Sequence, residues 1–284
     1  MKILITGVNG QLGSELYSTL KHENYGVDLS LENPSNNLFK IDLAYKENVL
    51  GLVEKVRPEW VVHCAALTNP DACETDMENA WKCNVIGTKN IVEACNKFNS
   101  KMIFISTDYV FDGTKGLYKE DDKVNPINFY GKTKVIGEWL TRTINGSIII
   151  RTSMLLSNRQ RSILNWVVES LEKGDVTAAT DMIGSPTLVS ELAEAISKVI
   201  ENNLSGIYHM AGDKRISRYE FMRKIAKIYD YEENKVKPTD INEIGFKSPR
   251  PKDTSLDITK VKNLGFRFSK IEDAIRKLRD SKIK

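Results

Sequence analysis

The feature of this sequence that most constrains its fold is a set of three glycines close to the N-terminus. Gly7, Gly10 and Gly13 have the spacing GxxGxxG, with the apolar stretch Lys2–Thr6 before them and the helix-like segment Gln11–Leu20 after them. A strand, a glycine turn and a helix in this order are typical of the first unit of a dinucleotide-binding sheet. The first glycine would permit the tight turn, the second would let backbone approach a pyrophosphate, and the third would let the helix pack on the strand. The unpaired N–H groups at the start of that helix would attract the phosphates.

Strand-like and helix-like segments alternate through the rest of the first half. The strand-like segments are Leu38–Leu43, the apolar run Trp60–Ala66, Lys101–Ser106 and Ser147–Arg151, and the helix-like segments are Tyr45–Val56, Glu78–Phe98 and Asn128–Thr143. Strands separated by helices of ten or more residues indicate parallel pairing with crossover helices. The pattern predicts an α/β fold with a Rossmann-type doubly wound parallel sheet.

The second half is less regular and predicts a smaller C-terminal substrate-binding lobe. Its expected elements are a strand at Gly206–Met210 and helices at Ser162–Lys173, Ser190–Asn202, Tyr219–Tyr229 and Lys270–Lys277. We expect residues 1–151 to form an NAD(P)-binding domain. Residues 152–284 would form mainly the lobe, with segments at about 190–210 returning to the sheet.

Composition and charge exclude several classes of protein. The balance of 41 Lys+Arg against 38 Asp+Glu, net +3, gives no reason to expect a nucleic acid polymer or a membrane surface as partner. No apolar run approaches the ~18 residues of a membrane span, and the start lacks the pattern of a signal peptide, so a cytoplasmic protein is expected. The four cysteines form no CxxC pair and the three histidines are scattered, which argues against zinc, dithiol or His-triad chemistry. A solvated helix face is expected for the basic residues near the C-terminus, which are Arg276, Lys277, Arg279, Lys282 and Lys284.

The choice between NADH and NADPH depends on the end of the second strand. An acidic residue there would hold the ribose hydroxyls, and a basic one would hold a 2′-phosphate. Asp28 or Ser30 could serve, and no Arg or Lys follows nearby in the segment Tyr25–Glu32. The residues alone leave both cofactors open.

The candidate catalytic pair is a tyrosine and a lysine four residues apart. The sequence has three such YxxxK pairs, at Tyr17/Lys21, Tyr130/Lys134 and Tyr231/Lys235. Since about one is expected by chance, position must decide between them. The first lies on the helix after the glycine turn and the third in a polar, Glu-rich stretch, so both are expected to be surface pairs. The second opens a helix just after the strand and loop that contain Thr107.

This spacing has a chemical reason. Residues i and i+4 share a helix face, and a lysine cation beside a tyrosine is expected to lower the phenol pKa from about 10, by ~1–3 units. Tyr130 could then exchange a proton near neutral pH, while the Thr107 hydroxyl polarises a carbonyl. The set suits hydride transfer from a nicotinamide to a carbonyl carbon, with Tyr130 protonating the oxygen.

With the run Asn84–Asn90 (NVIGTKN), these motifs resemble the extended short-chain dehydrogenase/reductase superfamily. Within it, the chain is similar to the dTDP-4-dehydrorhamnose reductases. The segments that carry this narrower resemblance are Ser106–Gly113, Asn125–Lys134, Arg151–Ser153, Arg250-Pro251 and Leu256-Asp257. The resemblance implies NAD(P)H-dependent reduction of the 4-keto group of a nucleotide sugar, most directly dTDP-4-dehydro-L-rhamnose to dTDP-L-rhamnose.

The resemblance also assigns roles to individual residues. Asn84 would organise the active-site polar network from a central helix. The catalytic residues would be Tyr130, Lys134 and Thr107. The cofactor would contact Gly7, then Gly10, Gln11 and Leu12 at the pyrophosphate, Asp42 and Leu43 at the adenine, Ala65 and Ala66 alongside, and Tyr130 and Lys134 at the nicotinamide ribose. The sugar substrate would face Thr68, Tyr109 and Met154.

Some features leave the function open. The family often has a tryptophan where this chain has Met154, although methionine can also fill an apolar pocket. Glu15 and Glu191 match carboxylates that hold a dimer-bridging magnesium in some relatives. No matching metal-binding residue is evident near the C-terminus. Both residues are therefore expected to be exposed helix glutamates, and no metal is predicted. The resemblance allows a homodimer. It also allows a regulatory subunit resembling the β subunit of methionine adenosyltransferase, which His63–Ala66 and Met154 fit equally well, or another nucleotide-sugar reductase or epimerase.

Overall fold

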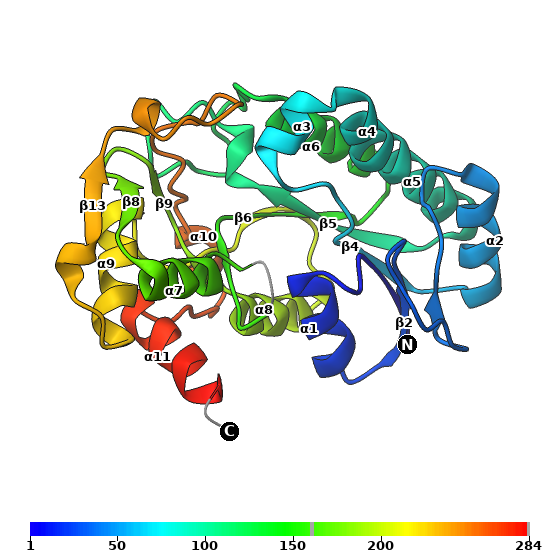
Figure 1. Cartoon of the computed structure of the whole chain (residues 1–284). Helices are drawn as coiled ribbons and strands as arrows, with labels where there is room; N and C mark the ends of the chain where they lie inside the picture. The colour runs from blue at the N-terminus through cyan, green and yellow to red at the C-terminus, as the bar shows by residue number, and fades with distance from the viewer. Residues whose placement is uncertain (160–161, 283–284) are drawn as a thin grey trace.

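A parallel sheet of seven strands organises the part of the chain that the computed structural model describes, residues 1–159 and 162–282 (Figure 1). Every strand pair in it is parallel, which confirms the predicted doubly wound sheet. The strands in spatial order are β11 (Gly206–His209), β6 (Ile148–Thr152), β5 (Lys101–Thr107), β4 (Trp60–His63), β1 (Lys2–Thr6), β2 (Glu23–Val27) and β3 (Leu38–Phe39).

Helices cover both faces of this sheet (Figure 1). One face packs on α1 (Gln11–Thr19) and α8 (Val189–Glu201), and the other on α2 (Lys46–Val56), α5 (Gly87–Phe98) and α6 (Phe129–Thr141). Consecutive residues of β1 enter the two cores in turn, because side chains alternate along a strand. Ile3 and Ile5 lie with the first helix pair, and Leu4 lies with the second group, all fully buried.

The strand order reverses between β1 and β4. From β1 the chain runs outward through β2 and β3, and from β4 it runs the other way through β5 and β6. In doubly wound sheets the crevice at the carboxyl ends of such a switch point is the usual ligand site. The glycine turn at Gly7 and the segment after His63 leave the sheet there.

The second half forms a separate apolar cluster at the left of Figure 1 and also returns to the sheet. The cluster packs α7 (Ile163–Lys173), α9 (Arg218–Ile228) and α11 (Ile271–Lys282) around the parallel pair β8 (Val176–Ala179) and β13 (Val236–Thr239). The smaller pairs are β7 (Leu155–Leu156) with β10 (Thr187–Leu188), and β9 (Ile183–Gly184) with β12 (Ile216–Ser217), and α10 spans Thr259–Asn263. β11 pairs with β6. The domain division at residue 151 stays a prediction.

Several predicted boundaries were wrong. The helix expected over Glu78–Phe98 is α4 (Met77–Trp81), a π-helical turn over Lys82–Ile86 and then α5. A further short helix, α3 (Pro70–Thr75), was not predicted. β3 is shorter than expected, and β4 ends at His63, because the residues after it bend away to line a cavity.

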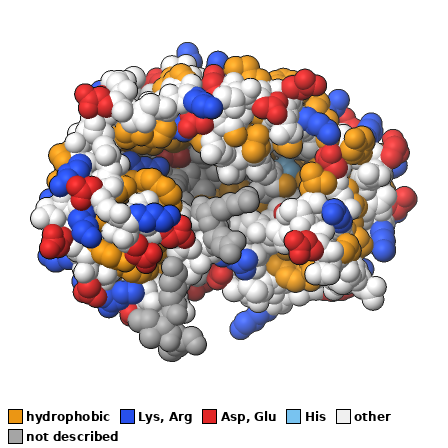
Figure 2. All heavy atoms as spheres, viewed as in Figure 1, with side chains coloured by type: hydrophobic (Ala, Val, Ile, Leu, Met, Phe, Trp, Pro, Cys, Tyr) orange, Lys and Arg blue, Asp and Glu red, His pale blue; other side chains and the backbone are white. Residues whose placement is uncertain are grey.

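The distribution of charge on the surface agrees with the nearly equal numbers of basic and acidic residues in the sequence. In Figure 2, basic and acidic side chains are interspersed over the visible face. On α11, Arg276 pairs with Asp273 and Lys277 pairs with Glu191, while the Lys282 side chain and Lys284 lie outside the described residues. None of the helices in the described ranges is long and apolar enough to cross a membrane.

Two histidines are buried in the sheet and stay neutral. His63 Nδ1 lies 2.7 Å from Thr6 Oγ1 and Nε2 lies 2.9 Å from Thr88 Oγ1. His209 Nδ1 lies 2.9 Å from the Tyr118 carbonyl oxygen. Burial first, and then the nearby cations Lys134 and Arg151, lower the pKa of each histidine to about 3.

These histidines make the fold sensitive to acid. Their folded pKa lies below the ordinary value of about 6.5, so between those values the unfolded chain binds protons that the folded chain does not. The part of the folding stability that depends on the neutral histidines is fully present well above pH 6.5 and is lost as pH falls toward 3. The free energy of unfolding should be about 3–4 kcal/mol smaller at pH 5 than at pH 7, measured by urea denaturation. His209→Gln should remove about half of that difference. Equal stability at both pH values would contradict the neutral buried histidines.

Candidate active site

A cavity of about 780 Å³ opens at the carboxyl ends of β1, β2, β4, β5 and β6. Its volume is within the ~300–1,000 Å³ of typical ligand sites. Every residue predicted to act in catalysis or to contact the cofactor or the sugar lines it, and their individual roles remain predictions. These residues are Gly7, Gly10, Gln11, Leu12, Asp42, Leu43, Ala65, Ala66, Thr68, Thr107, Tyr109, Tyr130, Lys134 and Met154.

The glycine turn forms one wall of the cavity through close backbone contacts. Gly7 has φ +70°, and a Cβ there would lie 2.8 Å from the Ala65 nitrogen. A Cβ on Gly13 would lie 2.1 Å from the Gly7 oxygen, so only glycine lets α1 approach the turn. Gly10 is the N-cap of α1, and no side chain accepts a hydrogen bond from the first N–H groups of this helix. The first turn of α1 also contains no acidic residue. The first N–H groups of α1 are therefore available to an anion.

The described residues also leave buried polar atoms without partners around this cavity. Thr152 Oγ1 and Arg218 Nη1 have no hydrogen-bond partner, and both residues line the cavity. Unpaired buried polar groups are costly, which is consistent with a ligand completing their bonds. The donor set and the glycine turn fit a dinucleotide together with a second anionic ligand.

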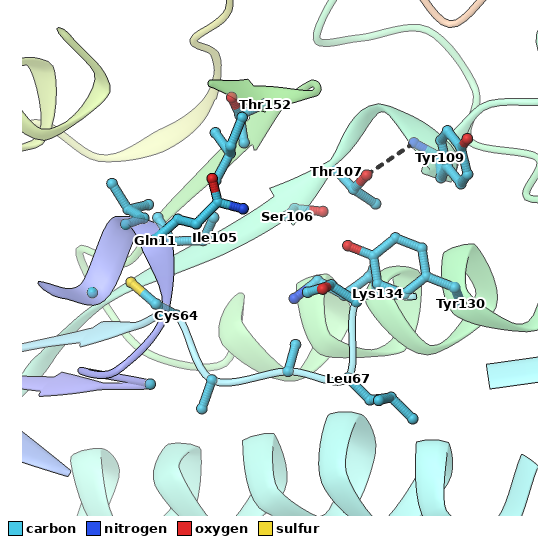
Figure 3. A pocket seen from close by; sticks show the side chains of 18 of the residues that line it. Gln11, Cys64, Leu67, Ile105, Ser106, Thr107, Tyr109, Tyr130, Lys134 and Thr152 are labelled. Atoms are coloured by element: carbon cyan, nitrogen blue, oxygen red, sulfur yellow. Dashed lines mark hydrogen bonds between the residues drawn. The ribbon is translucent and has the colours of Figure 1, made fainter. Parts of the chain in front are cut away.

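Thr107, Tyr130 and Lys134 lie together at one end of the cavity (Figure 3). Thr107 ends β5, and the other two lie one turn apart in the first half of α6. Asn128 caps α6 by accepting the Gly131 N–H at 2.8 Å. A Cβ on Gly131 would lie 2.2 Å from the Tyr109 oxygen. This glycine is what allows α6 to bring Tyr130 against the loop after β5.

The expectation that Lys134 lowers the pKa of Tyr130 below its ordinary value was wrong. Burial raises the pKa of Tyr130 well above its ordinary value, and the Thr107 hydroxyl only partly offsets this. Burial lowers the pKa of Lys134 to about 8. The Lys134 Nζ lies 4.1 Å from the centre of the Phe104 ring. Tyr130 is thus protonated at neutral pH and can donate a proton, while Lys134 changes charge in mildly alkaline solution.

Asp108 is a site residue that the sequence analysis missed. It is buried and lines the cavity beside Thr107. Its carboxylate accepts from the hydroxyls of Thr107 at 3.0 Å, Ser153 at 2.7 Å and Thr254 at 2.5 Å. Burial raises the pKa of the Asp108 carboxyl, and these three hydrogen bonds lower it by less. An acid directly after a strand end was the available signal, since ligands lie at the carboxyl ends of parallel strands.

Within the described part of the second half, Arg218 is the cation that lines the cavity. Arg218 begins α9, and its charge acts on both Tyr109 and Asp108. Its pKa is lowered by burial. Tyr109 also packs edge-on against Tyr130, with ring centroids 6.1 Å apart. Nothing local in the sequence marks Arg218, because only long-range folding brings α9 to the ends of β5 and β6.

A buried ion pair anchors the helix that carries Tyr130 and Lys134. Arg151 on β6 donates to Glu138 on α6 through Nε at 2.9 Å and Nη2 at 2.8 Å. Both side chains are about 1% exposed. Ser106 donates to the same carboxylate at 2.6 Å. Burial lowers the pKa of Lys134, and the Glu138 charge offsets part of that effect. Glu138 thereby connects α6 to β5 and β6, two of the strands whose ends form the site.

Asn84 lies outside the cavity in the π-helical turn and is buried. Its Oδ1 accepts the Leu67 N–H at 2.7 Å, and its Nδ2 donates to the Leu67 oxygen and to Thr133 Oγ1, both at 3.0 Å. Thr133 in turn donates to the Tyr130 carbonyl oxygen. Asn84 therefore ties the loop after β4 to the start of α6.

The expectation of exposed glutamates was wrong for Glu191. Its carboxylate accepts from the Ser269 N–H at 2.8 Å and from Lys277 at 3.1 Å, which fixes the start of α11 to α8. Glu15 is half-buried on α1. Over residues 1–159 and 162–282 no cluster of three acidic, His or Cys residues could hold a metal ion.

The chain resembles known proteins over nearly its whole length. Residues 1–282 match the family described as RmlD substrate binding domain. Spore coat polysaccharide biosynthesis protein SpsK of Bacillus subtilis (strain 168) is 34% identical over 279 residues, covering 97% of this chain and 95% of that protein. The dTDP-4-dehydrorhamnose reductase of Aggregatibacter actinomycetemcomitans is 30% identical over 98% of both chains. Methionine adenosyltransferase 2 subunit beta of Rattus norvegicus is 30% identical, covering 93% of this chain and 82% of that protein.

A solved structure shows the same fold in detail. The dTDP-4-dehydrorhamnose reductase from Bacillus anthracis str. Ames, in complex with NADP, superimposes with a TM-score of 0.91 at 30% identity. The match covers 99% of each chain.

Glu138→Gln should disrupt the anchor of α6. It leaves the Arg151 charge buried without its partner, so the free energy of unfolding should fall by about 3–5 kcal/mol. The matched control is Arg142→Gln, because Arg142 reaches Glu138 only at 3.9 Å from a half-exposed position. That control should cost less than about 1 kcal/mol. Urea denaturation measures both, and equal losses would contradict the anchoring role.

Proposed function

The chain belongs to the RmlD substrate binding domain family, and from this we propose that it reduces the 4-keto group of a nucleotide sugar. It is an NAD(P)-dependent oxidoreductase of a nucleotide-sugar reductase family. The proposed reaction converts dTDP-4-dehydro-L-rhamnose to dTDP-L-rhamnose. The observation that carries this proposal is the meeting of Thr107, Tyr130 and Lys134 with the glycine turn in one cavity.

The residues present fit a nicotinamide dinucleotide. The N–H groups of Gln11 and Leu12 would hold the pyrophosphate at the uncapped start of α1. Gly10 would lie against the pyrophosphate, while its own N–H donates to the Gly7 carbonyl oxygen at 2.9 Å. Asp42 and Leu43 would lie at the adenine, Ala65 and Ala66 alongside the cofactor, and Lys134 at the nicotinamide ribose. The nicotinamide, when bound, supplies the hydride for the carbonyl carbon.

Tyr130 supplies the proton in this proposal. As hydride reaches the carbonyl carbon, the oxygen takes the phenolic proton and the product is an alcohol. Burial raises the pKa of the Tyr130 phenol and so keeps it protonated at neutral pH, and the alkoxide that forms is a strong enough base to take the proton. Thr107 orients the oxygen, and the Lys134 cation stabilises the phenolate until solvent restores its proton.

The substrate would occupy the part of the cavity where residues of both halves of the chain form the wall. Its sugar would contact Thr68, Tyr109 and Met154. Met154 adopts a left-handed backbone with φ +39°, and its carbonyl oxygen accepts the Thr187 N–H at 2.9 Å, which fixes the residue at the cavity wall. Arg218 Nη1, which lacks a partner among the described residues, would bind the diphosphate.

A second candidate is a regulatory role like that of the methionine adenosyltransferase β subunit, which this chain resembles over most of its length. His63–Ala66 and Met154 fit that branch equally well. Copurification with an adenosyltransferase, together with no keto-sugar turnover, would favour it.

Tyr130→Phe tests the proposed proton donor. The variant loses one hydroxyl from a packed ring, so turnover of dTDP-4-dehydro-L-rhamnose should fall by roughly 10²–10⁴-fold, while cofactor affinity stays nearly unchanged. The matched control is Tyr17→Phe, which alters another YxxxK pair on α1 and should keep full activity. Nicotinamide absorbance follows both reactions. Full activity of Tyr130→Phe would rule out the mechanism.

The pH dependence of reduction tests Lys134. Because its pKa is about 8, the lysine is charged below that value and neutral above it. The kcat/KM for the keto-sugar should therefore decline as pH rises through about 8. Near-UV circular dichroism over the same range should show an intact fold. A flat profile up to pH 10 would mean that the Lys134 charge has no part in the reaction.

A further inference from the structure

Residues 246–251, which we call the strap, connect the second half of the chain to the first. Phe246 packs in an apolar cluster with Tyr109 and Met182, which both line the cavity, and Pro251 lines the cavity itself. Within residues 1–159 and 162–282, the strap forms no backbone-to-backbone hydrogen bond. Its position at the cavity must therefore be fixed by side chains.

Asp71 on α3 binds the strap from the first half of the chain. One oxygen of its carboxylate, Oδ1, accepts the N–H groups of Lys247 at 3.0 Å and Ser248 at 2.9 Å. The other oxygen, Oδ2, pairs with Arg250 at 3.0 Å. The Arg250 side chain is only 7% exposed, and its guanidinium lies 4.4 Å from the centre of the Phe246 ring. Hydrogen bonds to a charged group are the stronger kind, and here one carboxylate holds the strap at three residues.

A second cavity, of about 640 Å³, lies behind the strap. Arg250 and Pro251 line this second cavity, and Pro251 and Ile183 line both cavities. The strap is thus a wall with open space on either side, so little packing opposes a shift of its backbone. Asn128 adds one bond, from Nδ2 to the Pro249 carbonyl oxygen at 3.0 Å. The position of the strap therefore depends mainly on the bonds of the α3 carboxylate.

We propose that Asp71 is a positioning residue for the reduction, which holds the strap in place and thereby sets the affinity for the nucleotide sugar. The inference rests on the proposed function and deepens it. Asp71 does not line the cavity, so it acts through Pro251 and through the apolar cluster that contains Phe246. The glycine turn, which would hold the cofactor, packs instead on Ala65. Release of the strap should therefore weaken binding of the sugar nucleotide and leave cofactor binding intact.

Steady-state kinetics of the full chain test this role. Asp71→Asn removes the charge that pairs with Arg250 but keeps an acceptor for the two N–H groups, and Asp71→Ala removes both. The KM for dTDP-4-dehydro-L-rhamnose should rise by at least about tenfold in Asp71→Ala and by less in Asp71→Asn. The kcat, and the Kd of NADH and NADPH measured by nicotinamide fluorescence, should stay nearly unchanged. Hydrogen exchange over residues 246–251 should become faster in Asp71→Ala, because two N–H groups lose their acceptor.

Lys252→Gln is the matched control. Lys252 directly follows the strap and pairs with Asp181 at 2.8 Å, so this variant removes an ion pair that lies within the second half. It should keep the KM and the hydrogen exchange of the wild-type protein. Asp71→Asn carries the test if Asp71→Ala does not fold.

An unchanged KM in the Asp71 variants, an equal rise in Lys252→Gln, or a parallel loss of kcat and cofactor binding would overturn the inference. A wild-type chain that does not reduce the keto-sugar would count against the proposed function, and calorimetry with dTDP then decides the role of Asp71. Binding of dTDP that Asp71→Ala weakens would support that role, and equal or absent binding would overturn it.

Discussion

The buried ion pair between Glu138 and Arg151 is the interaction on which the arrangement of the site depends. It joins α6 to β6, and the Ser106 hydroxyl joins the same carboxylate to β5. Removing two charges from water is costly and is offset only when every bond is made, and here the guanidinium and the hydroxyl meet the carboxylate together. The ends of two strands and the face of one helix are thereby held in a fixed relation, which places Thr107 against Tyr130.

Burial then determines the chemistry of the groups that this anchor positions. A low-dielectric surrounding disfavours whichever form is charged. It therefore raises the pKa of Tyr130 and Asp108 and lowers that of Lys134. One physical cause keeps the proton on the phenol and makes the lysine the group that titrates near neutrality. This is the arrangement that a reduction requires, since the reaction consumes a proton at the carbonyl oxygen.

The sequence predicted what depends on local pattern. The glycine spacing and the alternation of segments were enough for the sheet, its ligand-binding edge and the position of Tyr130 and Lys134. It did not predict the π-helical turn at Asn84, whose bonds to Leu67 and Thr133 form only in the folded chain. It missed Arg218, because no local pattern shows that α9 reaches the ends of β5 and β6. The tyrosine pKa was also misjudged, since spacing places a lysine nearby but does not reveal how deeply both groups are buried.

Transfer of an isotope from cofactor to sugar tests the central claim most directly. The purified chain would be incubated with dTDP-4-dehydro-L-rhamnose and nicotinamide cofactor carrying deuterium at its hydride position, and the products examined by NMR and mass spectrometry. The account predicts dTDP-L-rhamnose with one deuterium at C4 and none at the other ring carbons. Unlabelled sugar, recovered unreduced while the labelled cofactor is bound, would contradict it.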